Sequence, residues 1–305
     1  MNNKVLFLIL AVLLSAFLLS KVLDSGKRTK SFNSELIAVD TAKITSITLH
    51  PKADNHAEVR LEKSDNTWSV KRGSESYTAD QAAISALLPS LAETKVKRLV
   101  ARSSDKWEQY EVTDSLGTRV QVNAGGKSLT DFVVGKFNFQ QQPQSMTSFV
   151  RKSKEDDVFA VDGFLSMAYN RGLDAWRDKS FVNVEPENIT RLEVMTPDGT
   201  TTYEKTLNGW SANGTALDSL KISNYLNGFK SMKVSTFDKL FEDAAPNYQL
   251  TISGNNMSPI EVICFEGKEE GTYILNSNQH DKNWAGSNVE GLFKQIFADA
   301  IELLK

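Results

Sequence analysis

Few residues of this chain combine the types and spacing that chemistry requires. Its three histidines are His50 at the end of an expected strand, His56 in a turn and His280 in a polar loop. No two of them stand four residues apart, the spacing that places a pair of zinc ligands on one helix face. The one cysteine, Cys264, lies in an apolar strand-like run, where a core thiol is favoured over a catalytic thiolate.

Three further patterns suggest chemistry but lack essential parts. The end of the string Asn123 to Ser128 resembles a phosphate-binding loop, yet Gln121 stands where that loop needs its first glycine, so we expect a hairpin turn. The acidic run Glu155 to Asp157 lacks the glycine and distal glutamate of a calcium loop. No Gly-x-Ser-x-Gly nucleophile motif occurs. We therefore predict a non-enzymatic protein with no catalytic, cofactor-binding or metal-ligating residues.

The charge balance excludes a class of partner. The chain has 35 basic and 38 acidic residues, for a net charge of −3, and no basic stripe interleaved with aromatic residues is evident. Nucleic-acid binding proteins usually carry a strong basic face. We expect no nucleic-acid partner, and a single cysteine excludes an intramolecular disulfide.

An uncharged apolar run follows the first residues. It reads VLFLILAVLLSAFLLS from Val5 to Ser20 and extends to Leu23 if Lys21 reaches back to the interface. As a helix, these 19 residues would be about 28 Å long, close to the roughly 30 Å of a bilayer core. Small residues at the positions needed for signal-peptide cleavage are missing. We predict an uncleaved, single-pass transmembrane helix in a bacterial inner membrane, in contact with lipid.

The residues after this predicted anchor could lie in the cytoplasm or in the periplasm. Lys21, Lys27, Arg28 and Lys30 follow the apolar run, and the positive-inside rule taken literally places them in the cytoplasm. Long carboxy-terminal regions can nevertheless be translocated despite flanking charge. We favour a periplasmic carboxy-terminal region on the grounds of the family resemblance below.

The remaining sequence contains the same order of signals twice. The first copy has strand patterns at Ile44 to His50 and Glu58 to Lys63, ending in Trp68-Ser-Val70. The second copy has them at Ile189 to Met195 and Thr201 to Thr206, ending in Trp210-Ser-Ala212. Trp68, Trp210 and Trp176 are either a ligand-binding aromatic surface or core residues, and the core interpretation is favoured because two of them recur at equivalent places.

In each copy a helix, a hairpin, a strand and a second helix follow. The first helices are expected at residues 81–96 and 219–234, and the second at residues 161–169 and 289–304. The loop Lys136 to Thr147, which contains a glutamine-rich run, is longer than its counterpart and is either a tolerated insertion or a partner contact. The prediction is an α+β fold: an anchor (1–27), a linker (28–40) and two repeats (41–180 and 181–305), each a twisted, mostly antiparallel sheet with packed helices.

This pattern resembles the bacterial domain-of-unknown-function 4340 family. The resemblance rests on the hairpin ending at Trp68, on Ala79-Asp80 before a leucine-rich helix, on Lys95-Val96 after it, and on three short strings. These strings are Val133-Val-Gly135, Phe149-Val150 and Trp176-Arg-Asp-Lys-Ser-Phe181. The resemblance implies a membrane segment and a role beside ABC transporter subunits of the gliding-motility type, and it supplies no catalytic residues.

Three classes of function follow in order of preference. The first is an envelope scaffold or accessory subunit of an ABC-type transporter or assembly complex, in contact with its permease and ATPase subunits. The second is an extracytoplasmic binding module for a peptide or glycan, and the third is an enzyme with an unfamiliar site. A concave pocket would favour the second class, and convergent titratable groups with perturbed pKa values would favour the third.

Overall fold

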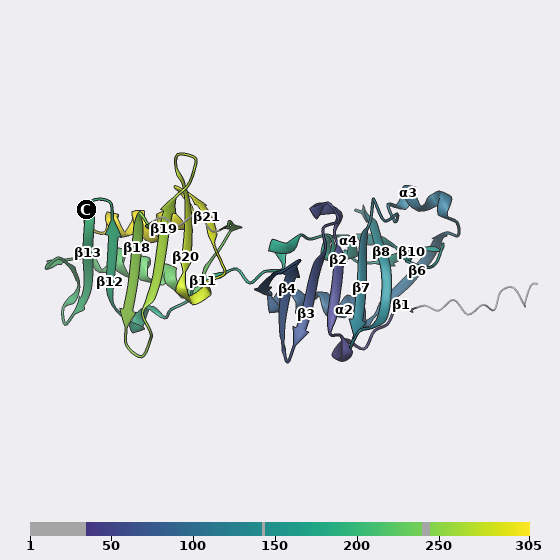
Figure 1. Ribbon diagram of the computed structural model, residues 1–305, viewed down its shortest axis with the longest axis horizontal. Coiled ribbons are helices and arrows are strands. Elements are labelled where there is room, and N and C mark those ends of the chain that lie inside the picture. The colour runs from purple at the N-terminus through teal and green to yellow at the C-terminus, as the bar shows by residue number, and fades with distance from the viewer. Residues whose placement is uncertain (1–34, 142–143, 240–244) are drawn as a thin grey trace, which may run out of the picture. The chain divides into compact units, whose positions relative to one another are not determined.

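A computed structural model describes residues 35–141, 144–239 and 245–305. These residues form two compact units (Figure 1). The first contains the residues up to Ser74 together with Ala82–Leu173, and the second contains Glu75–Gln81 and Asp174–Lys305. The segment Glu75–Gln81 therefore belongs to the second unit although the chain on both sides of it belongs to the first.

The first unit is built on an antiparallel sheet with the order β1-β6-β10-β9-β8-β7-β2-β3-β4-β5 (Figure 1). The strands of this sheet are β1 (Glu35–Ile37), β2 (Ser46–His50), β3 (Val59–Ser64), β4 (Thr67–Arg72), β5 (Glu75–Thr78), β6 (Thr94–Ala101), β7 (Thr118–Ala124), β8 (Lys127–Gln140), β9 (Ser145–Lys152) and β10 (Val158–Asp162). Of these strands, β5 falls in the segment Glu75–Gln81 of the second unit. The helices of the first unit are short: α2 (Gln81–Ala92), α3 (Trp107–Tyr110) and α4 (Leu165–Tyr169).

The second unit has a sheet with the order β15-β14-β13-β12-β18-β19-β20-β21-β17, and a separate pair, β11-β16. The strands are β11 (Ser180–Val182), β12 (Ile189–Thr196), β13 (Gly199–Thr206), β14 (Gly209–Ala212), β15 (Thr215–Ala216), β16 (Met232–Lys233), β17 (Thr236–Phe237), β18 (Tyr248–Gly254), β19 (Ile260–Glu266), β20 (Thr272–Ser277) and β21 (Ala285–Asn288). Helix α5 (Ser219–Asn227) and a π-helix (Lys294–Ala298) leading into α6 (Asp299–Glu302) complete it.

The two sheets share one strand order. Starting from β6, the first sheet follows β6-β10-β9-β8-β7-β2-β3-β4-β5. Starting from β17, the second follows β17-β21-β20-β19-β18-β12-β13-β14-β15, which is the same succession of strands along the chain. The short strand that precedes each sheet also agrees, because β1 pairs with the start of β6 and β11 pairs with β16.

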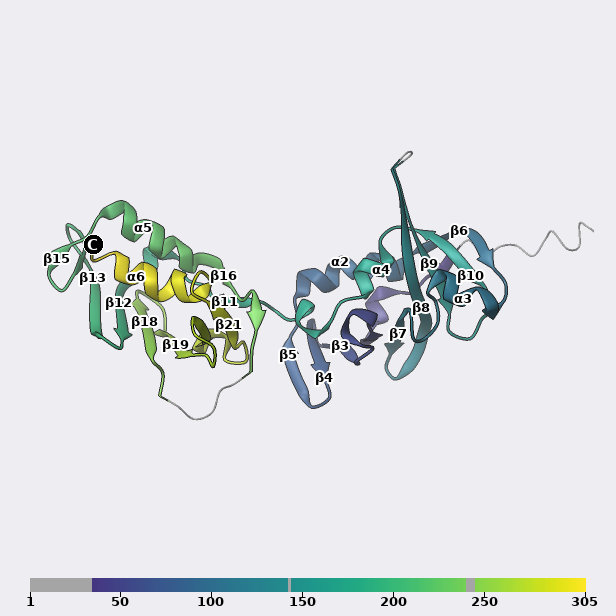
Figure 2. The ribbon, with the colours of Figure 1, turned by 90° about the horizontal axis from the view of Figure 1, so that it is seen from above.

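Helices cover one face of each sheet, as the turned view shows for α2 and α4 in the first unit and for α5 and α6 in the second (Figure 2). Alternation along the strands produces this arrangement: Val120 and Val122 of β7 are fully buried, whereas the intervening Gln121 is only half-buried. In α2 the side chains that spacing places on one face, Ile84, Leu87 and Leu91, are buried. One face of each sheet thus carries the core.

The predicted α+β class is wrong. Antiparallel strands dominate both units, and each predicted helix is shorter than expected or gives way to a strand. Lys95 and Val96, placed at the end of the first helix, belong to β6, and residues 161–162 belong to β10. These stretches contain β-branched residues and form strands, because hydrogen bonding to a neighbouring strand stabilises them more than the weakly helical spacing of their apolar residues stabilises a helix.

Among the described residues, no helix is long and apolar enough to cross a membrane. The predicted anchor, Val5 to Leu23, lies outside these residues.

Candidate docking site on a projecting hairpin

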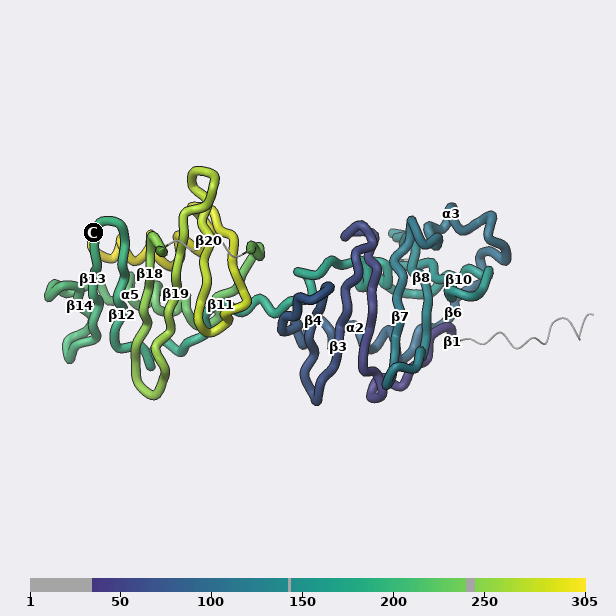
Figure 3. Tube along the Cα trace, in the orientation of Figure 1, coloured from purple at the N-terminus to yellow at the C-terminus, as the bar shows by residue number. Residues whose placement is uncertain are grey.

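Strand β8, the longest strand among the described residues, extends beyond the sheet to which it belongs. Its first part pairs with β7 as far as Val134, which lies opposite Thr118. After an irregularity between Val134 and Phe137, the strand continues to Gln140 and pairs only with β9. Figure 2 shows β8 and β9 reaching past the neighbouring strands as a hairpin, which we call the arm (residues 135–141 and 144–148). Figure 3 traces β8 beside β7 in the same unit.

A glycine lies at the base of the arm. A Cβ atom at Gly135 would collide with the main-chain oxygen of Tyr110 and with a Val112 methyl group. Only glycine lets the strand pass this close to the end of α3, at the point where it leaves the sheet.

Two aromatic side chains project from the arm. Phe137 is 45% exposed and Phe139 is 42% exposed. Two residues apart on one strand, they lie on the same face of the hairpin, opposite Ser148 and Met146 of β9. Exposed aromatic rings at adjacent positions of one face are typical of interaction surfaces.

Helix α4 adds to the apolar surface beside the arm. Its start is tied to β9 because the amide of Gly163 donates to the Met146 carbonyl at 3.1 Å, and the Ser148 hydroxyl donates to the Gly163 carbonyl at 2.7 Å. Phe164 and Met167 are 43% and 58% exposed. Meanwhile α4 buries Leu165 and Tyr169 in the core, so its position is fixed.

A hollow of about 490 Å³ lies at the base of the arm. Val134 and Phe137 are among the residues that line it, together with the ion pair between Lys52 Nζ and Glu111 Oε2, which are 3.0 Å apart. The Asn170 side-chain oxygen accepts from the Ala53 amide at 2.7 Å and holds the rim in place. The hollow could accept an apolar side chain of a partner, with a polar rim to orient it.

The chemistry-bearing residues of the sequence do not gather in this site. His50 ends β2, His56 lies in a turn with φ 59°, and His280 lies in a short 3-10 turn. No group of three or more metal-ligating side chains occurs within residues 35–141, 144–239 and 245–305. Cys264 is fully buried in β19, as predicted for a core thiol, and burial raises its pKa.

The string Asn123 to Ser128 forms the predicted hairpin turn. Ala124 of β7 lies opposite Lys127 of β8, and Gly125 and Gly126 between them have φ angles of 55° and 82°. Glycine is favoured at both positions of such a turn. The segment leads from strand to strand, which excludes the strand-to-helix geometry of a phosphate loop.

The tryptophans differ in burial although they occupy matching places. Trp68 of β4 lies opposite Lys63, and Trp210 of β14 lies opposite Lys205. Trp68 is buried, whereas Trp210 is only partly buried against the second core. Trp176 is fully buried. The core interpretation is confirmed for Trp68 and Trp176 and holds in part for Trp210.

Sequence reasoning missed a buried cation within the string Trp176 to Phe181. Arg177 is 5% exposed, and its guanidinium carbon lies 3.8 Å from the ring centre of Tyr77 and 3.5 Å from that of Phe237. It donates to the Asp174 carboxylate at 3.2 Å and to the Lys282 carbonyl at 3.1 Å. Stacking and hydrogen bonds together offset the cost of burying this charge. Its contacts join separate segments of the second unit, which is a structural role.

The second unit has a short connection where the first has its arm. Strand β19 ends at Glu266 and β20 begins at Thr272, with a turn closed by a hydrogen bond from the Gly267 amide to the Thr272 carbonyl. The sequence does carry a signal for the arm. Phe137-Asn-Phe139 alternates apolar and polar residues, the pattern of a strand.

Fold and site together define a β-rich, two-unit protein with an exposed aromatic hairpin. The profile of a family described as a domain of unknown function, DUF4340, matches residues 71–251, more than half of the chain. The chain belongs to this family. The match runs from β4 to β18 and includes the arm. No curated protein and no solved structure matches the chain.

Proposed function

We propose that this protein is a non-enzymatic, membrane-anchored envelope protein that serves as an accessory or scaffold subunit of an ABC-type transporter or envelope-assembly complex. In this proposal residues 5–23 hold it in the bacterial inner membrane and the two units lie in the periplasm. The permease and ATPase subunits are its partners. The single observation that supports docking is the arm with its exposed Phe137 and Phe139.

The exposed rings set the scale of the interaction. A phenylalanine side chain buries about 200 Å² when fully covered, so covering the remaining 40–45% of each ring would remove about 90 Å² from water. At about 25 cal/mol per Å² this contributes about 2 kcal/mol for each ring. Confinement to the membrane plane raises the effective concentration of partners, so two such contacts can support a complex.

Co-purification from mild detergent tests this proposal. The full chain should recover ATPase and permease subunits, and Phe137→Ser combined with Phe139→Ser should reduce that recovery at least tenfold. The matched control is Leu207→Ser with Leu220→Ser, which removes two apolar side chains of the second unit that are even more exposed, and it should leave recovery unchanged. Equal recovery with both pairs of substitutions would remove the arm from the proposal. Recovery of the protein alone, while a known transporter stays intact, would contradict the accessory role itself.

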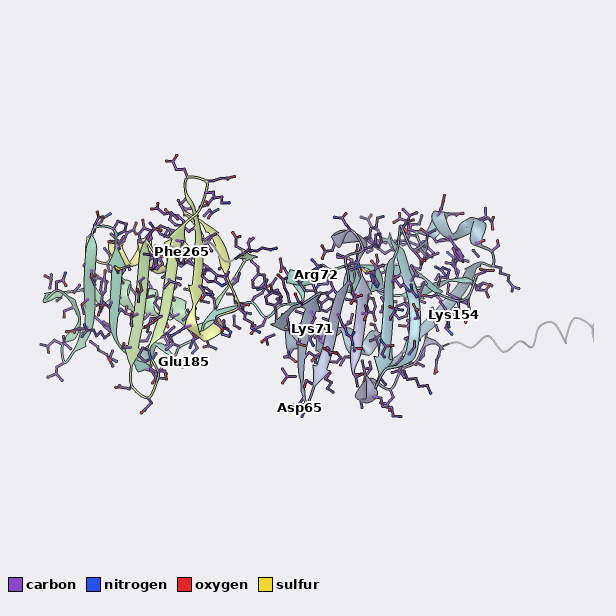
Figure 4. The ribbon with its side chains drawn as sticks, in the orientation of Figure 1. Asp65, Lys71, Arg72, Lys154, Glu185 and Phe265 are labelled. Atoms are coloured by element: carbon purple, nitrogen blue, oxygen red, sulfur yellow. The ribbon has the colours of Figure 1, made fainter. Side chains whose placement is uncertain are left out.

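A second candidate function is a binding module for a glycan or peptide, and one observation favours it. The helix-free face of the first sheet has a polar hollow of about 630 Å³, lined in part by Ser46, Arg60, Glu62, Lys71 and Asn123. Arg60 and Lys71, the latter labelled in Figure 4, both pair with Glu62. Chemical-shift changes at these residues on adding cell-wall saccharides, absent for the Arg60→Ala variant, would support this reading over the first.

A further inference from the structure

The pairing of β1 with β6 lies beside a row of exposed cations. Strand β6 and the turn after it carry Lys95, Lys97, Arg98 and Arg102, all of them exposed, which we call the basic edge. Between Thr94 and Lys106 the sequence has five basic residues and one acidic residue, while the whole chain has a net charge of −3. Positive charge is thus concentrated at this place in an otherwise acidic protein.

The basic edge is only partly neutralised. Lys95 pairs with Glu93 at 2.7 Å and Lys97 pairs with Asp162 at 3.0 Å, and all four side chains of these pairs are largely solvated. Neither Arg98 nor Arg102 forms an ion pair with any residue in the described ranges. Exposed pairs are worth little, so these cations remain able to interact with an external anion.

Protection of a sheet edge against aggregation is the usual reason for such lysines. The second unit provides a comparison, because β16 and β17 hold the place of β6 in a sheet of the same strand order. There Ser235 and Thr236 follow Lys233-Val234, where the first unit has Lys97 and Arg98 after Lys95-Val96. Edge protection would apply to both sheets. The added cations occur only in the first.

The first unit also differs from the second in that it directly follows the predicted membrane segment. Glu35, where β1 begins, lies opposite Lys95 of β6. The residues between Leu23 and Glu35 number 11, which span at most about 38 Å when fully extended. If residues 5–23 lie in the membrane, Glu35 is held within that distance of the lipid surface, and the Lys95 end of the basic edge lies beside Glu35.

We propose that the basic edge binds the anionic phospholipid headgroups of the membrane in which the chain is anchored, and so sets how the first unit lies on that surface. The inference rests on the membrane anchoring stated under the proposed function. Each cation close to an anionic bilayer contributes about a fivefold change in the equilibrium, equivalent to roughly 1 kcal/mol. The interaction acts over a Debye length of about 8 Å at physiological salt and weakens as salt rises.

A fluorescent probe on the full chain tests the proposal. The exposed Ser104, two residues after Arg102, is replaced (Ser104→Cys) and labelled with an environment-sensitive dye, while buried Cys264 remains unlabelled. The protein is placed in nanodiscs of neutral phosphatidylcholine or of phosphatidylcholine with phosphatidylglycerol. We expect a blue-shifted emission only in the anionic discs, abolished by 0.5 M salt.

Charge-removing variants complete the test. Lys97→Ser with Arg98→Thr introduces the residues of the second unit and should weaken the contact about 30-fold, or about 2 kcal/mol. The control, Lys63→Thr with Lys127→Ser, removes the same charge elsewhere in the first unit and should leave the shift in place. Equal emission in the two kinds of disc, or equal loss in both variants, would overturn the headgroup contact and favour edge protection. Anchoring is tested separately by carbonate extraction of membranes: a protein that is extracted refutes the anchor, whereas a retained protein without a blue shift refutes the headgroup contact alone.

Discussion

Ionisation of a buried tyrosine provides a sharp test of the second core. Tyr203 of β13 is 1% exposed, and its hydroxyl donates to the Ala300 carbonyl at 2.7 Å, which holds α6 against the sheet. Burial raises the pKa of Tyr203 to about 12. In an unfolded chain a tyrosine has a pKa of about 10.

The sign of the effect follows from proton binding. Below pH 10 both states hold the proton, so the contribution of Tyr203 is fully present. Between pH 10 and pH 12 the unfolded state loses the proton first, so the free energy of unfolding falls as pH rises. Because the pKa of Tyr203 differs by about two pH units between the folded and unfolded states, the free energy of unfolding should fall by about 2 kcal/mol by pH 12.

Tyr203→Phe removes this dependence and the hydrogen bond together. At pH 8 the variant should be less stable than the parent chain by about 1 kcal/mol, because one buried hydrogen bond is lost while the Ala300 carbonyl keeps its bond from the Leu303 amide. As pH rises, the free energy of unfolding of the parent chain falls relative to that of the variant. The two free energies should become equal near about pH 10.7, and the variant should be the more stable one above it.

Urea denaturation followed by circular dichroism, at intervals from pH 8 to pH 11.5, measures both free energies. Tyr169 and Tyr225 are also buried and their pKa values are raised, and both are present in the two proteins. Tyr169 cancels in the difference, whereas Tyr203 is one of the groups that raise the pKa of Tyr225. Parallel curves that never meet would refute the assignment of a buried, hydrogen-bonded Tyr203. An unchanged stability at pH 8 would refute the hydrogen bond alone.

Three further predictions concern the first unit and its counterpart. Gly135→Ala should lower the free energy of unfolding by about 1 to 3 kcal/mol, because the added methyl group overlaps the main chain beside the arm. An unchanged stability in thermal denaturation would show that the strand can shift at this position. Trp68→Ala should cost about 3 to 5 kcal/mol and Trp210→Ala clearly less, since only the first ring is buried; equal losses in urea denaturation would contradict this order. Burial opposes ionisation of Asp131, but hydrogen bonds from Arg119 and two neutral side chains outweigh burial and lower the pKa of Asp131. The contribution of Asp131 to the free energy of unfolding is therefore present above about pH 4 and is lost as pH falls through the lowered pKa. Asp131→Asn should therefore lower stability at pH 7 and flatten its dependence on acid, and a variant with an unchanged acid profile would show that this carboxylate is not stabilised in the fold.

Short-range signals predicted the hairpins well. The turn at Gly125-Gly126 is confirmed, and so is the strand pair predicted at Ile189 to Met195 and Thr201 to Thr206, because two strands with alternating polarity flank each turn. The start of α5 is confirmed as well: the Asp218 carboxylate accepts from the amides of Leu220 and Lys221, at 2.9 and 2.8 Å.

Helix ends could not be predicted from spacing alone. The expected helix 81–96 ends at Ala92 because the following residues pair with β1 and β10, and partners so distant along the chain leave no local signal. The predicted helix 289–304 is replaced by a turn, a π-helix and a short α6. Cations buried against aromatic rings, such as Arg177, also depend on contacts that only the folded chain creates.

The candidate site illustrates the same limit. The segment Lys136 to Thr147 was expected to be a loop, yet as far as Gln140 it is strand and pairs with β9. Its alternating Phe137-Asn-Phe139 was available in the sequence. What was not available was the close passage of Gly135, which decides where the arm leaves the sheet.

A sheet covered on one face also restricts how its strands can change in length. Inserting one residue within β7 would move every later side chain to the opposite face and expose Val120 or Val122 to water. The outer part of the arm is free of this penalty because its residues 136–141 are exposed, and adding two residues to each of its strands preserves the face that carries Phe137 and Phe139. Among related sequences, arm lengths should therefore differ by multiples of four residues, with aromatic residues at alternate positions, while the strands behind them keep a constant length.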